Sequence, residues 1–137
     1  MTTGPGADPT VLFVCEHGAA KSVLAAELLQ RKLDELDLPI QIHAAGIDPS
    51  DAIADSVVGL IPERAWELRT RRPRRVTQQD IETASITITF NLATAALPTA
   101  PAAVLAWDDV PPLSDDPVAA RAAIERHVEA LVERPRA

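Results

Sequence analysis

The sequence is poor in the residues that build disulfide-linked, metal-bound or membrane-spanning folds. Cys15 is the one cysteine among 137 residues, which excludes an internal disulfide framework and a cysteine-rich zinc site. No stretch is long and apolar enough to cross a bilayer, and residues 1–9 lack the basic start and apolar core of a secretory signal. We therefore expect a cytoplasmic protein, because a lone thiol survives in a reducing compartment.

Aromatic residues and positive charge are also scarce. The chain has two Phe, two Trp and no Tyr, so that Ala, Val, Leu and Ile must form the core. The formal net charge of −7 argues against binding to nucleic acid or to an anionic membrane. A chain of this length fits one domain. We expect residues 1–9 to be a disordered lead and residues 10–134 to form a single domain.

The pattern of apolar residues predicts alternating strands and helices. Residues 11–14 form a continuous apolar run, which is typical of a strand buried in a parallel sheet. Further strands are expected at residues 40–44, 85–90 and 102–106. Helices are expected at residues 22–36, 54–67 and 77–84, and from Asp116 onward with Val118, Ile124, Val128 and Leu131 facing inward. This order predicts a three-layer α/β/α sandwich around a short, four-stranded parallel sheet.

The predicted topology places a site at one edge of the sheet. Ligands of open α/β sheets bind outside the carboxyl ends of the strands. Cys15 ends the first strand and Asn91 follows the third, while Asp108 and Asp109 follow the fourth. We therefore expect these side chains to open onto the same edge.

The residues after Cys15 have the composition of an anion-binding loop. Gly18 permits the left-handed backbone with which such a loop turns its amides inward. A cation, Lys21, comes next, and a helix begins beside it whose N-terminus favours an anion. We call residues 16–22 the thiol loop. The residues expected to bind an oxyanion are Glu16, His17, Gly18, Ala19, Ala20, Lys21 and Ser22.

Two features of this segment have alternative explanations. Cys15 is either a nucleophile or a small core residue that ends a strand, since free cysteines are often fully buried. Ser22 either caps the helix or forms a hydrogen bond with the thiol. The sequence leaves both roles of Ser22 open.

A strand, a cysteine, five residues, a cation and a serine that opens a helix resemble the low-molecular-weight protein tyrosine phosphatase family, which includes one class of arsenate reductases. The likeness extends over most of the chain, because Ala44-Ala45-Gly46 resembles the family's Ser-Ala-Gly and residues 72–81 resemble its basic stretch and Thr-x-x-Asp. The resemblance implies that this chain has the family's fold and needs neither a metal nor an organic cofactor. The chain departs from the family pattern at Lys21, where arginine is usual, and at Gly18, where asparagine is usual. Lysine lacks the planar fork that binds two phosphoryl oxygens at once.

The resemblance also implies a general acid. Asp116, in the pair Asp116-Pro117, resembles the Asp-Pro pair that supplies the family's acid. The same pair is equally typical of a helix N-cap followed by proline, so that both roles stay open. The alternative acids are Asp108, Asp109 and Asp115. The predicted catalytic residues are Cys15, Lys21, Ser22 and Asp116.

Three functions are compatible with these residues. The favoured one is a phosphatase that hydrolyses phosphomonoesters, phosphotyrosine among them, through a phosphocysteine at Cys15. The second is an arsenate reductase that uses an external small thiol, because the chain has no further cysteine to relay a disulfide. The third is a degenerate, non-catalytic module that binds an oxyanion, which Lys21 and Gly18 would favour. All three take phosphate or another oxyanion as ligand.

Residues 69–75 contain five arginines in an otherwise acidic chain. Such a segment either steers a phosphorylated protein toward the site or forms a solvated loop, and we favour the loop. His43 and His127 have no spacing to other ligand residues that would indicate a metal site. The sequence makes no prediction about the natural substrate or the oligomeric state.

Overall fold

The computed structural model describes residues 9–133. Residues 1–8 of the expected disordered lead and residue 134 of the expected domain lie outside this range, so that both boundaries stay predictions. The strands are β1 (Thr10–Cys15), β2 (Gln41–Gly46), β3 (Ile86–Thr89) and β4 (Val104–Ala106). The helices are α1 (Lys21–Leu36), α2 (Asp55–Leu60), α3 (Ala65–Thr70), α4 (Gln78–Thr83) and α5 (Pro117–Glu133), with 3-10 turns η1 (Pro62–Arg64) and η2 (Thr94–Ala96).

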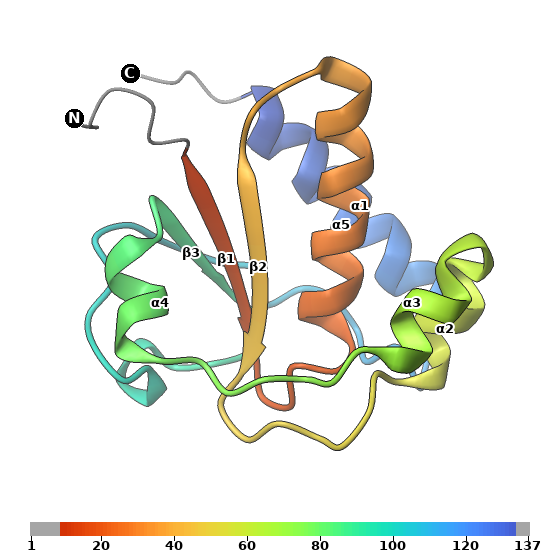
Figure 1. The fold of residues 1–137 in the computed structure, drawn as a ribbon, viewed down its shortest axis with the longest axis horizontal. Coiled ribbons are helices and arrows are strands. Elements are labelled where there is room, and N and C mark those ends of the chain that lie inside the picture. Colours follow the sequence, from red (N-terminus) through yellow and green to blue (C-terminus); the bar gives the residue numbers. More distant parts are fainter. Residues whose placement is uncertain (1–8, 134–137) are drawn as a thin grey trace.

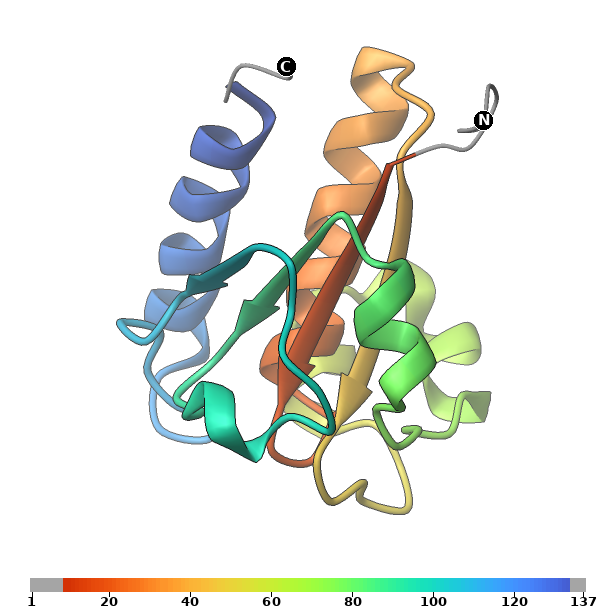
Figure 2. The same ribbon diagram turned by 90° about the vertical axis from the view of Figure 1, so that its left-hand side faces the viewer.

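The four strands form one parallel sheet in the order β2-β1-β3-β4. Helices α1 and α5 cover one face and α4 covers the other, as Figures 1 and 2 show. The predicted three-layer α/β/α sandwich is therefore confirmed. In this register Cys15 lies opposite Gly46 of β2, and Val14 lies opposite Thr89 of β3. The carboxyl ends of three strands thus meet around Cys15.

The burial of β1 on both faces explains why its sequence is an unbroken apolar run. Strand β1 is paired on both sides, and its side chains alternate between the two helical layers. Phe13 is fully buried on the α1 and α5 side, where its ring lies 5.5 Å from that of Trp107. Leu12 and Val14 are buried on the α4 side with Ile81. Every residue of β1 after its first is therefore buried.

Two details of the helices differ from the sequence-based expectations. The single helix expected at residues 54–67 is divided into α2, η1 and α3, because Pro62 has no amide hydrogen to continue a helical ladder. Val118 was expected to face inward, and this was wrong: it is 73% exposed. At 100° per residue it lies about 120° around α5 from the buried Ile124. The buried residues of α5 are Ala120, Ala123, Ile124 and Val128.

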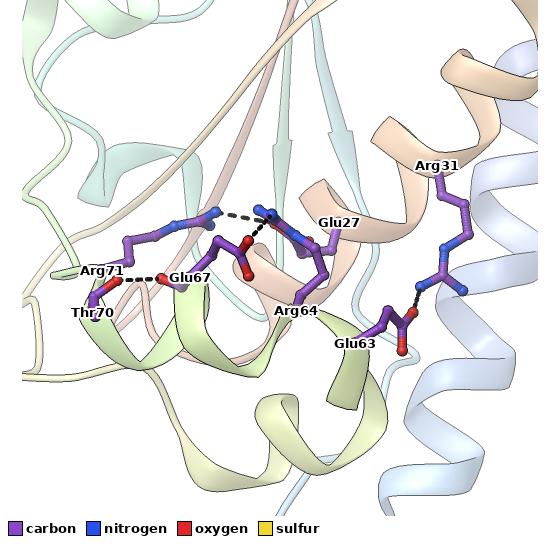
Figure 3. Close-up of polar contacts among 7 residues, drawn as sticks. All are labelled: Glu27, Arg31, Glu63, Arg64, Glu67, Thr70 and Arg71. Carbon is purple, nitrogen blue, oxygen red and sulfur yellow. Dashed lines mark hydrogen bonds and ion pairs between the residues drawn. The ribbon is translucent and has the colours of Figure 1, made fainter.

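An ion-pair network fastens η1 and α3 to α1 (Figure 3). The carboxylate of Glu27 accepts hydrogen bonds from Arg64 Nε at 2.8 Å and from Arg71 Nη2 at 3.1 Å. One turn further along α1, Arg31 pairs with Glu63. Burial raises the pKa of Glu27, but the two guanidinium groups lower it further, so that its pKa lies below the ordinary value of 4.5.

We expect Glu27→Gln to lower the free energy of unfolding by about 1–2 kcal/mol at neutral pH, because two charge-assisted hydrogen bonds are lost from a side chain that is only 12% exposed. A carboxylate whose pKa is depressed by folding stabilises the fold above its unfolded pKa and loses that effect as the pH falls through its folded pKa. The difference between wild type and variant should therefore shrink below pH 4.5.

Urea unfolding of both proteins across this pH range measures the effect. Glu35→Gln is the matched control on α1, since the Glu35 carboxylate is 62% exposed and lies 3.8 Å from Lys32. It should change stability by less than about 0.5 kcal/mol. Equal destabilisation by the two substitutions would contradict the assigned role of Glu27.

Candidate active site

Cys15 lies at the bottom of a cleft, where β1 ends between β2 and β3. The residue is 7% exposed, and its Sγ lies 3.0 Å from Oγ of the fully buried Ser22. Helix α1 begins at Lys21, and no side chain caps its N-terminus. Of the two roles considered for Ser22, the structure therefore shows the contact with the thiol and not the cap.

The backbone of the thiol loop is oriented so that its carbonyl groups and its N–H groups have different partners. The carbonyl groups of Cys15 and of three loop residues accept hydrogen bonds of 2.7–3.2 Å from the segment after β2. The acceptors are Cys15, Glu16, His17 and Ala19, and the donors are the amides of Ile47, Asp48, Ser50 and Ala54. Within the described part of the chain, no amide from Glu16 to Ser22 donates to a protein acceptor. These N–H groups at a helix N-terminus are therefore available to an anion above Cys15.

Two glycines allow this loop to lie against the end of β2. Gly18 has a φ of +60°, which disfavours residues with a Cβ atom. A Cβ on Gly18 would lie 2.7 Å from the Gly46 amide nitrogen, and a Cβ on Gly46 would lie closer still to the Gly18 amide nitrogen. The close approach explains why the Ala44-Ala45-Gly46 segment, noted above for its resemblance, ends in glycine.

Lys21 is held by a residue that follows β3, and this residue is bound in turn by one that follows β4. Its Nζ donates to Asn91 Oδ1 at 2.7 Å. The Asn91 amide nitrogen in turn donates to Asp108 Oδ1 at 2.7 Å, and its Nδ2 donates to the Asp108 carbonyl at 3.1 Å. Burial lowers the pKa of Lys21 below its ordinary value of 10.5, although the negative charges of Cys15 and Asp108 oppose the shift. The expected meeting of Asn91 and Asp108 at the sheet edge is confirmed, whereas the contacts of Asn91 with Asp108 and with Lys21 were not anticipated.

The cleft above Cys15 has a volume of about 490 Å³. This is in the range of small-molecule sites, so that the cleft has room for an oxyanion and an attached organic group. The lining residues are Cys15, Glu16, His17, Ala19, Ala20, Lys21, Ser50, Ala54, Ser56, Phe90, Asn91, Pro112, Leu113 and Ser114.

Two of the candidate acids, Asp116 and Asp109, form hydrogen bonds and are not among the residues that line this cleft. Asp116 is exposed and caps α5, since its Oδ1 accepts from the Ala119 amide at 3.0 Å. It follows the lining residue Ser114 by two positions and does not itself line the cleft. Asp109 faces α5, where a 2.6 Å hydrogen bond from His127 lowers its pKa. The structure thus brings Cys15, Lys21 and Ser22 together, whereas Asp116 is not among the residues that line the cleft.

The arginine-rich segment is mostly occupied by contacts within the protein. Arg69 lies 3.7 Å from Asp55, Arg71 binds Glu27, and Arg74 binds Asp80 at 2.7 Å. Arg75 donates to the Ile47 carbonyl at 2.8 Å. These contacts support the favoured explanation of a structural, solvated loop.

Residues 9–133 show neither a candidate metal site nor a membrane-spanning helix. No group of three or more His, Cys, Asp or Glu side chains within this range is arranged to hold a metal ion. None of the helices in the same range combines the length and low polarity needed to cross a membrane.

Comparisons with known proteins agree with this geometry. A curated Halobacterium salinarum protein, provisionally named an arsenate reductase, is 29% identical over 87 residues, which make up 62% of this chain and 61% of the relative. The arsenate reductase of Archaeoglobus fulgidus is 27% identical, with a TM-score of 0.68 over 90% of this chain and 99% of that one. A low molecular weight phosphotyrosine phosphatase of Vibrio cholerae has a TM-score of 0.77 at 21% identity, over 91% and 95%.

This chain also matches a sequence model that describes a whole family. The sequence model described as low molecular weight phosphotyrosine protein phosphatase matches residues 10–102, from β1 to the residues before β4. That range includes Cys15 and the whole thiol loop. The chain therefore belongs to the low molecular weight phosphotyrosine protein phosphatase family, whose members are cysteine-dependent phosphatases or arsenate reductases acting on phosphate or related oxyanions.

Proposed function

We propose that this protein is a cytoplasmic phosphatase that hydrolyses phosphomonoesters through a phosphocysteine at Cys15. The observation that carries the proposal is the thiol loop: among residues 9–133, its amides from Glu16 to Ser22 have no protein acceptor, and the Cys15 thiol contacts Ser22 beside them. Family membership supports the chemistry. The single cysteine supports the compartment, since a lone nucleophilic thiol must stay reduced.

In the first step the Cys15 thiolate attacks phosphorus, the bond from phosphorus to the ester oxygen breaks, and a sulfur–phosphorus bond forms. The loop amides and the Lys21 ammonium hold the non-bridging oxygens as negative charge develops on them. The leaving oxygen needs a proton, and Asp116 is the proposed donor. Its Oδ1 accepts the cap bond, which leaves Oδ2 to carry that proton.

In the second step water attacks the phosphocysteine. The carboxylate that gave up its proton takes one from the water, the sulfur–phosphorus bond breaks, and phosphate leaves. The Ser22 hydroxyl, 3.0 Å from Sγ, donates a hydrogen bond to the departing thiolate. The cleft volume of about 490 Å³ admits a substrate with an organic group, and a phosphorylated protein side chain such as phosphotyrosine is one candidate.

Arsenate reduction is the second candidate, favoured by the names of the two relatives reported above. In this route Cys15 displaces hydroxide from arsenate, and an external thiol then attacks the cysteine sulfur. That attack forms a mixed disulfide and reduces As(V) to As(III), and a second thiol regenerates Cys15. The route needs the external thiols because the chain has no further cysteine.

The experiment that tests the proposal compares two reactions of the purified, full chain. We expect hydrolysis of an aryl phosphate to exceed the rate seen with Cys15→Ser. Arsenite formation that depends on a small thiol, without phosphatase activity, would favour the second candidate. If neither reaction occurs and inorganic phosphate still raises the melting temperature, the protein is a non-catalytic oxyanion binder and the proposal fails.

A further inference from the structure

We propose that Asn91 and Asp108 are positioning residues that hold the Lys21 ammonium ready for the oxyanion. The inference rests on the proposed function, because it concerns the charge that the same site presents. In this chain Lys21 stands where the family usually has arginine. An arginine would bring a rigid, planar fork to the phosphoryl oxygens, whereas a lysine brings a point charge on a flexible stem. A lysine at this position therefore needs an external restraint.

The side chain of Asn91 supplies that restraint in one orientation. Its Nδ2 donates to the Asp108 carbonyl at 3.1 Å, and its Oδ1 accepts from Lys21 Nζ at 2.7 Å. The reversed amide would set an NH₂ group against an ammonium, and both of these groups are donors. Asp108 therefore decides which end of the Asn91 amide faces Lys21.

Asp108 also holds the backbone of Asn91. Asn91 has a φ of +56°, a conformation that residues other than glycine seldom adopt, although asparagine tolerates it best. The Asn91 amide donates to Asp108 Oδ1 at 2.7 Å, and this bond offsets part of the conformational cost. Two contacts from one residue thus fix both the backbone and the side chain that hold Lys21.

The restraint leaves the positive charge of Lys21 available. Asn91 is neutral and accepts from one of the three ammonium donors, so that two donors remain for an anion. An aspartate in its place would pair with the ammonium and compete with the oxyanion. Both Lys21 and Asn91 line the cleft above Cys15, so that the restrained ammonium lies where the anion is expected.

A double-mutant cycle on inorganic phosphate binding, measured by calorimetry, tests this role. Asn91→Gly removes the side-chain amide and introduces glycine, which adopts a positive φ without strain. It should weaken phosphate binding about tenfold in the wild-type background and by less than about twofold in Lys21→Met. Asp108→Ala should show the same dependence on Lys21. The matched control is Asp37→Gly, since Asp37 has a φ of +54° at the end of α1 and should leave phosphate affinity unchanged.

Equal weakening by Asn91→Gly in both backgrounds would mean a general structural role and would overturn the inference, as would unchanged or tighter binding in the wild-type background. The cycle does not depend on turnover. If the protein binds phosphate but hydrolyses no aryl phosphate, the proposed function fails while the cycle still decides the role of Asn91. If wild type binds no phosphate, both fail.

Discussion

Cys15→Ser should reduce hydrolysis of an aryl phosphate by about 10⁴-fold or more, because no other thiol is present to form the covalent intermediate. A serine hydroxyl at the same place is a far weaker nucleophile without a base beside it. The thiol loop depends on backbone hydrogen bonds that this substitution leaves in place. Inorganic phosphate should therefore still bind to the variant.

Steady-state kinetics and phosphate titration of the two proteins measure these effects separately. Ser22→Ala is the control, because it keeps the thiol and removes only the hydroxyl that lies 3.0 Å from it. That variant should retain measurable turnover, slowed by about 10- to 100-fold. Turnover by Cys15→Ser at the wild-type rate would exclude the thiol mechanism.

Lys21→Met should lower kcat/KM by about 10²- to 10³-fold, the usual effect of removing one electrostatic contact to the transition state. The substitution keeps an unbranched chain of similar length and removes the charge. Lys21→Arg should restore turnover to at least the wild-type level, since it returns the charge and adds a second donor to the phosphoryl oxygens. Loss of activity in Lys21→Arg as severe as in Lys21→Met would contradict a role for the charge.

The pH dependence of kcat/KM also distinguishes lysine from arginine at position 21. Burial lowers the pKa of Lys21 below 10.5, against the opposing charges of Cys15 and Asp108. The ammonium acts while it is protonated, so that wild-type activity should fall as the pH rises through that lowered pKa. Arginine stays charged throughout this range. The alkaline limb of kcat/KM should therefore move to higher pH in Lys21→Arg, and identical limbs would rule out titration of Lys21.

The parts of the site that could be predicted from sequence are those set by local pattern and topology. The apolar run that ends at Cys15 predicted a strand buried in a parallel sheet, because strands buried on both faces are typically apolar throughout. The order of elements then placed Cys15 and Asn91 at one edge. The family resemblance, carried by the spacing of Cys15, Lys21 and Ser22, is confirmed.

The parts that could not be predicted depend on contacts between distant segments. Lys21 and Asn91 are 70 positions apart, and their hydrogen bond requires the register of β3 beside β1. The approach of Gly18 to Gly46 depends likewise on how β2 pairs with β1. The sequence left two roles open for Ser22, because a serine near the start of a helix can either cap the helix or form a hydrogen bond with the thiol. The buried position of its hydroxyl under Cys15 distinguishes them.

During turnover, phosphorus should become bonded to the sulfur of Cys15. Rapid quenching of the wild-type protein with an aryl phosphate, followed by mass spectrometry of its peptides, tests this directly. We expect one phosphoryl group on the peptide that contains Cys15, and none on that peptide from Cys15→Ser. Turnover by wild type with no phosphoryl group on Cys15, or with the group on another residue, would exclude the phosphocysteine mechanism.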